Sequence, residues 1–114
     1  MTECLFCGIA AGDIAAVRVR EGPRTVAFRD INPQAPVHVL VIPKDHYPDL
    51  AALARAGGGL LDEVATQAHE VAAAEGVDKS GYRVVFNTGP GAGQTVPHAH
   101  AHVLGGRAFG WPPG

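Results

Sequence analysis

The segment of residues 98–103 constrains the fold of this chain more than any other. It reads HAHAHV, so histidine alternates with small or β-branched apolar residues. Side chains point alternately to the two faces of a β-strand. A strand here would place three imidazoles on one face and apolar side chains on the other. The pattern therefore predicts a strand whose apolar face joins a core and whose polar face carries a candidate site.

The flanking residues predict further strands and a helix. Apolar runs bounded by Gly or Pro indicate strands at residues 17–19, 25–28, 38–42 and 82–86, followed by the strand at 98–104. An Ala-rich stretch over residues 48–76 has apolar side chains at helical spacing and ends at Gly76. Strands, a helix and further strands follow one another without βαβ alternation. We therefore expect an antiparallel α+β domain.

Length and composition narrow the class of protein. With 114 residues the chain fits one domain, residues 1–114. The 9 basic and 11 acidic residues give a formal charge of −2, so the charge balance does not indicate a nucleic-acid partner. No apolar run approaches the ~20 residues that span a bilayer, and the start of the chain does not read as a signal peptide. We therefore expect a cytoplasmic protein without a membrane partner.

Three histidines on one strand face allow two kinds of chemistry. In one, neutral imidazoles bind a catalytic zinc whose open position activates water. In the other, one imidazole attacks phosphorus while a neighbour orients it. The plain alternative is a polar, solvated strand face without a site. Residues 89–95 read GPGAGQT, and backbone N–H groups of such a loop can bind phosphate oxygens, although a plain hairpin loop is the alternative. The spacing alone leaves both chemistries open.

Two motifs resemble the signatures of one family. Residues 93–106, GQTVPHAHAHVLGG, look like the histidine triad signature. Residues 28–38, FRDINPQAPVH, followed by VIPK at 41–44, resemble the second hallmark of the same family. With its terminal WPPG, the chain is most similar to the nucleotide-binding (Hint) branch of the histidine triad (HIT) family. The resemblance implies a five-stranded antiparallel sheet with one long and one short helix, and a homodimer in which Trp111 reaches toward the partner's site.

The resemblance also implies a role for each matching residue. His100 would be the nucleophile that forms a nucleotidyl-histidine intermediate, with His102 and His38 hydrogen-bonded around it. Thr95, where the branch often has Ser, would contact the phosphate. The remaining implied contacts are Asn87 and Gly93 for the phosphate, Asp30 for the ribose, Phe6, Ile9, Phe28 and Ile31 for the base, and Gln94 as a further substrate-binding residue.

The only two cysteines of the chain, Cys4 and Cys7, are three positions apart. This spacing suggests a metal pair or a redox pair, and two free thiols are the plain alternative. In some members of the family, the resemblance implies, the pair joins two histidines in a structural zinc site. Here those histidines are His46 and His98, and the zinc would not be required for catalysis.

The resemblance thus implies hydrolysis of a purine nucleoside 5′-phosphoramidate or an acyl-adenylate, a conjugate of AMP or GMP. A dinucleoside polyphosphate hydrolase or nucleotidyl transferase is the alternative with related chemistry. A nucleotide-binding regulatory module is the alternative from another class.

Overall fold

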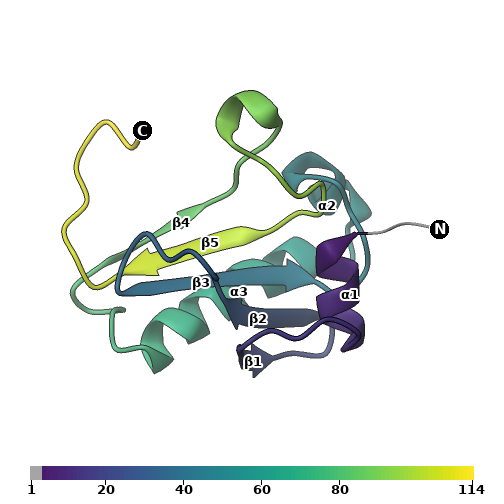
Figure 1. Cartoon of the computed structure of the whole chain (residues 1–114), viewed down its shortest axis with the longest axis horizontal. Coiled ribbons are helices and arrows are strands. Elements are labelled where there is room, and N and C mark those ends of the chain that lie inside the picture. The colour runs from purple at the N-terminus through teal and green to yellow at the C-terminus, as the bar shows by residue number, and fades with distance from the viewer. Residues whose placement is uncertain (1–3) are drawn as a thin grey trace.

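The computed structural model describes residues 4–114 as a five-stranded antiparallel sheet with helices on both faces (Figure 1). The strands are β1 (Arg18–Glu21), β2 (Thr25–Arg29), β3 (Val37–Pro43), β4 (Tyr82–Val85) and β5 (Ala101–Gly105). The helices are α1 (Leu5–Ala11), α2 (Leu50–Ala56) and α3 (Leu60–Ala74), with a short 3₁₀ turn, η1 (Pro90–Ala92). The sheet order β1-β2-β3-β5-β4 confirms the antiparallel α+β fold and sets the last strand beside β3.

The helices differ from expectation in one respect. The stretch expected as a single helix over residues 48–76 is divided into α2 and α3, so there are three α-helices instead of one long and one short. The break is a run of three glycines, Gly57, Gly58 and Gly59, with φ values of 68°, 64° and 77°. Glycine adopts positive φ without the clash that a Cβ would cause, so the chain turns sharply there. The run is visible in the sequence and is a break signal.

The histidine-containing strand is shorter than expected, but its alternation holds. β5 begins at Ala101, and before it the Ala99 N–H donates to the Tyr47 carbonyl at 2.6 Å instead of joining the ladder. Ala99, Ala101 and Val103 are nevertheless buried in one core cluster with α3. The histidines between them therefore lie on the opposite face, as the pattern predicts.

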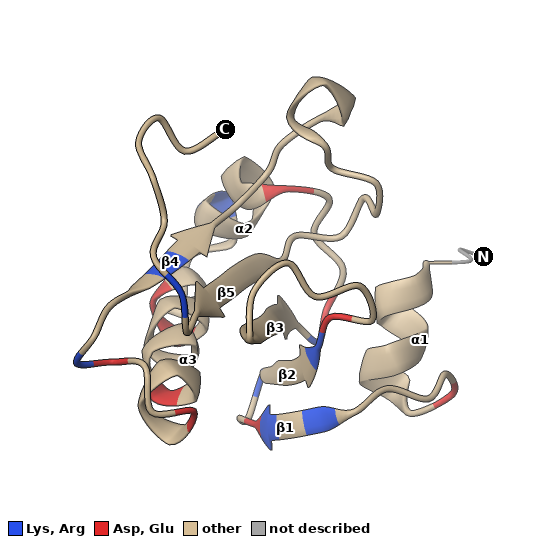
Figure 2. Ribbon diagram, turned by 60° about the vertical axis from the view of Figure 1, so that its left-hand side comes forward, with Lys and Arg blue, Asp and Glu red and all other residues tan. Residues whose placement is uncertain are grey.

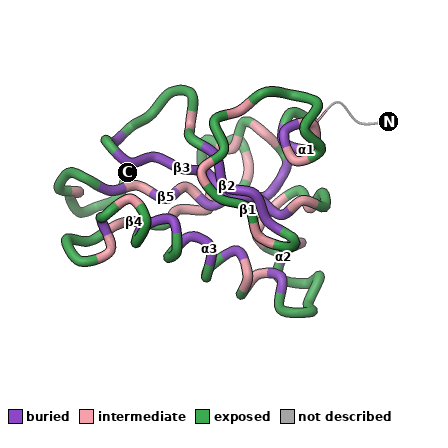
Figure 3. Tube along the Cα trace, turned by 90° about the horizontal axis from the view of Figure 1, so that it is seen from below, coloured by how far each residue is buried: buried purple, intermediate pink, exposed green. Residues whose placement is uncertain are grey.

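Two apolar clusters cover the two faces of the sheet, and α3 and α1 lie on opposite sides of the strand layer (Figure 3). On one face, α3 packs Val64, Ala68, Val71 and Ala72 onto the central strands. On the other face, a smaller cluster joins α1 to β2 and β3; its buried members are Phe6, Ile9, Val26, Phe28, Leu40 and Ile42. Because both faces are covered, all seven residues of β3 are buried. α1 and the histidines share the same face.

Charged residues of both signs lie around the outside of the fold (Figure 2). Three ion pairs tie α3 and its C-cap residue to the sheet side: Arg20 to Glu70 at 3.6 Å, and Arg24 to Glu63 and Arg29 to Glu75, each at 2.8 Å. Such exposed pairs add little to the stability because water screens their attraction, so the apolar contacts dominate the docking of α3. None of the helices in residues 4–114 is long and apolar enough to cross a membrane.

Candidate active site

Two neighbouring strands bring histidines together on the face that α1 covers. His38 lies on β3 and His102 on β5, and His38 Nε2 is 2.9 Å from His102 Nδ1. The ring of His100 lies beside His102, with 4.9 Å between the ring centroids. The antiparallel register of β3 and β5 therefore assembles the predicted histidine cluster from distant parts of the chain.

A backbone hydrogen bond determines where the protons of this cluster lie. The Gln34 N–H donates to His38 Nδ1 at 3.0 Å, so that nitrogen is an acceptor and the proton of neutral His38 lies on Nε2. His38 Nε2–H then points to His102 Nδ1, with Asp30 Oδ2 at 3.3 Å as a second acceptor. His102 must in turn carry its proton on Nε2. One peptide N–H thereby sets the tautomers of two imidazoles.

Both of these histidines are held neutral. Burial lowers the pKa of His38, although the nearby Asp30 carboxylate opposes the shift. Burial, followed by repulsion from His100 and His38, lowers the pKa of His102 to about 4. Near pH 7 the pair therefore offers a directed N–H donor instead of a positive charge.

His100 has the hydrogen bond that prepares an imidazole for nucleophilic attack. Its Nδ1 lies 2.7 Å from the His98 carbonyl oxygen, which can only accept, so the proton is on Nδ1. The Nε2 atom consequently keeps its lone pair. His100 is 7% exposed, and its ring and that of Phe6 pack in a T-shaped arrangement with 5.0 Å between the centroids. His100 is thus fixed in orientation by one hydrogen bond and one aromatic contact.

A cavity of about 670 Å³ lies between α1 and the histidines. Its lining includes most of the predicted site: His100, His102, Asp30, Thr95, Phe6, Ile9, Phe28 and Ile31. Phe6, Ile9 and Phe28 also belong to the core, whereas Ile31 is 98% exposed and stands at the mouth. The cavity lies within the range of roughly 300–1,000 Å³ found for small-molecule sites, with apolar walls and few polar groups.

Several lining residues were not predicted from the sequence. The segment of residues 14–17, IAAV, forms part of the wall together with Leu5, Leu40 and Val96. This segment connects α1 to β1, where no periodic pattern marks one side as facing a ligand. Only the packing of α1 against β2 and β3 shows its role.

The Gly-rich loop between β4 and β5 is braced by the side chain of Gln94. Its Oε1 accepts from the Gly89 N–H at 2.8 Å, and its Nε2 donates to the carbonyls of Pro48 at 2.8 Å and Val96 at 3.1 Å. The Gln94 amide is therefore occupied by backbone groups. Thr95 lines the cavity, whereas Asn87 and Gly93 do not, so their phosphate contacts stay predictions.

Cys4, Cys7, His46 and His98 form a second cluster, whose ligand atoms all lie within 4.8 Å of one another. The Sγ–Nδ1 distances are 3.4 Å for Cys4–His98, 3.5 Å for Cys7–His98 and 3.3 Å for Cys7–His46. A tetrahedral zinc with ordinary bond lengths separates its sulfur and nitrogen ligands by about 3.5 Å. The four side chains therefore fit a closed structural zinc site.

The protonation pattern around this cluster also suits a metal. His98 Nε2 lies 2.9 Å from the Pro43 carbonyl and donates to it, which leaves the Nδ1 lone pair facing the thiols. Burial lowers the pKa of His98 and so keeps this lone pair free. Burial and the adjacent Cys4 raise the pKa of Cys7, so a thiolate there requires a compensating cation.

This geometry favours a nucleophile over the three-histidine metal centre. Within residues 4–114, the groups able to hold a metal are the Cys₂His₂ cluster and Asp30 with His38 and His102. His98 belongs to the first cluster, so the three strand histidines do not converge. In the second cluster the Gln34 N–H keeps the His38 proton on Nε2, the atom that would have to bind the metal.

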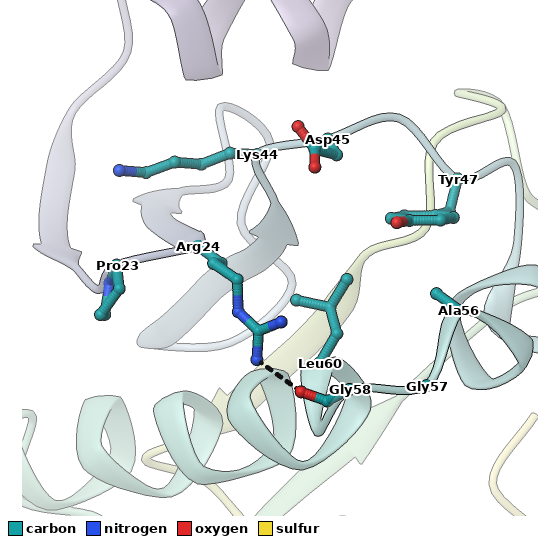
Figure 4. A pocket seen from close by; sticks show the side chains of 9 residues that line it. All are labelled: Pro23, Arg24, Lys44, Asp45, Tyr47, Ala56, Gly57, Gly58 and Leu60. Atoms are coloured by element: carbon teal, nitrogen blue, oxygen red, sulfur yellow. Dashed lines mark hydrogen bonds between the residues drawn. The ribbon is translucent and has the colours of Figure 1, made fainter.

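A smaller cavity of about 260 Å³ lies beside α3, with Arg24 and Lys44 in its wall (Figure 4). Both cations already bind other groups of the protein. Arg24 binds Glu63 at 2.8 Å and the Gly58 carbonyl at 3.1 Å, and Lys44 binds Glu21 at 2.7 Å. Figure 4 shows the Lys44 side chain extending away from Tyr47. The cavity at the histidines is therefore the better candidate for an anionic ligand.

Several known proteins are similar to this chain in sequence and in fold. A model of the HIT domain family matches residues 11–109. The crystal structure of a HIT family hydrolase from Legionella pneumophila Philadelphia 1 has a TM-score of 0.93 and 48% identity, and the match covers 98% of this chain and 100% of that chain. The 14 kDa zinc-binding protein of Zea mays is 45% identical over 112 residues, 96% of this chain and 87% of that protein. A histidine triad nucleotide-binding protein from Candida albicans has a TM-score of 0.83 and 31% identity, with coverage of 96% and 83%.

Proposed function

The chain belongs to the HIT family, and from this premise we propose that it hydrolyses purine nucleoside 5′-phosphoramidates or acyl-adenylates through a nucleotidyl-histidine intermediate at His100. The observation that carries the proposal is the 2.7 Å contact between His100 Nδ1 and the His98 carbonyl, in a ring that lines the large cavity. It leaves an imidazole lone pair on Nε2 at the wall of a site large enough for a nucleotide. The Legionella relative is named a hydrolase, which agrees with this reaction class.

The proposed reaction has two steps. In the first, the Nε2 lone pair of His100 forms a bond to phosphorus, and the bond from phosphorus to the leaving amine breaks. The amine departs with the bonding electron pair and takes up a proton from water. The His100 ring then carries positive charge, which its Nδ1–H shares with the His98 carbonyl. In the second step water attacks phosphorus, releases one proton, and yields the nucleoside monophosphate and neutral His100.

His102 and His38 support these steps without changing charge. Because His102 carries its proton on Nε2, it can donate a hydrogen bond to a phosphoryl oxygen or to the leaving group. A preorganised donor of this kind is worth ~10²–10³ in rate when it resembles an oxyanion hole. The low pKa of His102, about 4, means that it acts as a neutral donor at pH 7.

The cavity supports the proposed nucleotide contacts. Asp30 lies at its wall with Oδ1 bound to the Asn32 N–H at 2.8 Å, and the carboxylate has further lone pairs for ribose hydroxyls. The apolar residues around Phe6 and Phe28 would hold the base, and the Thr95 hydroxyl would contact the phosphate. The related Candida protein is named a nucleotide-binding protein, in agreement with these contacts.

The proposed zinc site would have a structural role only. Its four ligands would hold the N-terminal end of α1, and α1 supplies Phe6 and Ile9 to the cavity wall. The Zea mays relative is named a zinc-binding protein. No step of the proposed reaction passes through this metal.

We also propose that the protein is a homodimer with Trp111 at the interface. Trp111 is 85% exposed in the single chain. A large exposed aromatic side chain is typical of a protein–protein interface.

The test is release of AMP from adenosine 5′-phosphoramidate by the wild type and by His100→Ala. We expect the variant to lose at least about 10³-fold in kcat while it still binds AMP. A matched control is His69→Ala, because His69 is exposed on α3 and its one side-chain hydrogen bond within residues 4–114 joins it to the Tyr82 hydroxyl at 2.9 Å. Equal turnover by wild type and His100→Ala would eliminate His100 as the nucleophile. An inactive wild type that binds AMP would favour the binding-module alternative.

A further inference from the structure

The backbone of Gln34 connects the histidine pair to the segment that follows β5. Its N–H donates to His38 Nδ1 at 3.0 Å, and its carbonyl accepts from Arg107 Nε at 3.1 Å. The two hydrogen bonds lie on either side of the same Cα. Arg107, which is exposed and does not line the cavity, therefore restrains the residue that sets the tautomer of His38.

Arg107 is itself well anchored. Its guanidinium carbon lies 4.3 Å from the centroid of the Phe109 ring, and its Nη1 donates to the Ala108 carbonyl at 3.0 Å. Just before it, Gly106 has a φ of +88°, and a Cβ at that position would lie 2.9 Å from the Pro36 Cβ. The segment after β5 thus packs closely against the loop that leads into β3.

Arg107 differs in what it binds from the four arginines between residues 18 and 29, and resembles Arg83 of β4, which donates to the Gly110 carbonyl. Arg18, Arg20, Arg24 and Arg29 each pair with a glutamate. Across residues 4–114, Arg107 has no such ion pair, and its hydrogen bonds go to two peptide carbonyls. A guanidinium bound to peptide oxygens orients backbone without neutralising a carboxylate. Arg107 therefore orients the backbone of the loop that contains Gln34.

The orientation of the Gln34 N–H matters because the histidine pair has two possible arrangements. With the N–H on His38 Nδ1, the His102 proton lies on Nε2, and His102 is a donor. If the N–H turned away, His38 could carry its proton on Nδ1 and accept from His102 Nδ1–H. His102 Nε2 would then present a lone pair and could only accept.

We propose that Arg107 is a positioning residue that holds Gln34 so that the proton of His38 stays on Nε2 and His102 remains a hydrogen-bond donor. The effect of Arg107 on turnover rests on the proposed function. The tautomers themselves are a property of the free protein and can be measured without substrate.

The first test is ¹⁵N NMR of the histidine side chains in the free, full-length protein at pH 7. In the wild type we expect both His38 and His102 to carry the proton on Nε2. In Arg107→Ala we expect the ¹⁵N shifts of both rings to move toward the Nδ1-protonated form or to average between the two. Arg83→Ala is the matched control, because Arg83 lies 5.1 Å from the same Phe109 ring but donates to the Gly110 carbonyl instead of Gln34.

The second test is the kinetics of AMP release from adenosine 5′-phosphoramidate. Loss of one supporting hydrogen bond predicts a fall in kcat of about three- to tenfold for Arg107→Ala. KM should change by less than about twofold, because Arg107 makes no contact with the cavity. Arg83→Ala should keep wild-type values. Should Arg107→Ala fold poorly, Arg107→Gln removes the guanidinium more gently and is expected to shift the same resonances.

Unchanged histidine ¹⁵N shifts in a folded Arg107 variant would overturn the proposal, even if kcat fell. Nδ1 protonation of His38 in the wild type would overturn it as well. An inactive wild type whose shifts respond to Arg107→Ala would refute the proposed hydrolase reaction and leave the positioning role standing.

Discussion

Replacement of Cys7 by serine would test whether the Cys₂His₂ cluster builds one wall of the nucleotide cavity. α1 has only seven residues, and an isolated helix of that length is not stable in water. Two of the four proposed ligands, Cys4 and Cys7, lie at its N-terminal end, and Phe6 and Ile9 of the same helix line the cavity. Removal of one ligand should therefore weaken both metal binding and the position of the wall.

The buried side chains of α1 set an upper limit on the loss of stability in this variant. Phe6 and Ile9 are each 5% exposed, and they are the buried side chains that α1 would expose if it detached. At about 1.5–3 kcal/mol for each side chain, the free energy of unfolding would fall by at most about 3–6 kcal/mol. Arg18 also binds the Ile9 carbonyl at 2.5 Å, so part of the attachment should remain. Since small proteins have about 5–15 kcal/mol of stability in total, the fold should survive in weakened form.

The assay compares zinc content, urea unfolding and the Kd for AMP in the wild type and in Cys7→Ser, each with and without a strong chelator. We expect the wild type to bind one zinc per chain, and the variant to bind less and to have a higher Kd for AMP. The chelator should bring the wild type close to the variant and leave the variant nearly unchanged. A variant with full zinc content, or a chelated wild type with unchanged stability and unchanged AMP affinity, would refute the reasoning.

Two further predictions concern the histidine pair and the core. Because the pKa of His102 falls from 6.5 to about 4 on folding, the unfolded chain binds more protons between these values, and stability should be lost as pH falls from 6.5 toward 4. This pH-dependent loss of stability is up to about 3 kcal/mol, and it should be missing from His102→Asn. Urea unfolding of both proteins across this pH range measures it. Equal changes in the free energy of unfolding with pH in the two proteins would contradict the prediction. Leu53 of α2 is fully buried in the core cluster beneath α3, so Leu53→Ala should lower the free energy of unfolding by about 2–5 kcal/mol with little change in kcat. A loss below about 1 kcal/mol by the same measurement would show that the site collapses around the smaller side chain.

The sheet could be predicted from the sequence because side chains alternate between the two faces in every β-strand, so alternation of apolar and polar residues marks a strand locally. The alternation in residues 98–103 assigned Ala99, Ala101 and Val103 to the core, where the structure has them. The division between α2 and α3 was also within reach of the sequence, because a run of three glycines seldom continues a helix. The resemblance to the HIT family carried the individual roles, and most of the residues it named line one cavity.

The wall formed by residues 14–17 and the brace formed by Gln94 could not be predicted in the same way. Neither shows a periodic pattern, and each depends on which distant segment happens to pack beside it. Gln94, for example, reaches the Pro48 carbonyl, a partner 46 positions earlier in the chain.

The sequence by itself determined which segments contain strands, although not their exact ends, which face of the last strand carries the histidines, and which side chains are chemically able to act. Only the tertiary structure decided their protonation and orientation. The proton of His38 is on Nε2 because the N–H of Gln34 meets Nδ1, and the proton of His100 is on Nδ1 because the His98 carbonyl faces it. A tautomer depends on the partner that each ring nitrogen meets in space, and residue identity and spacing do not specify that partner.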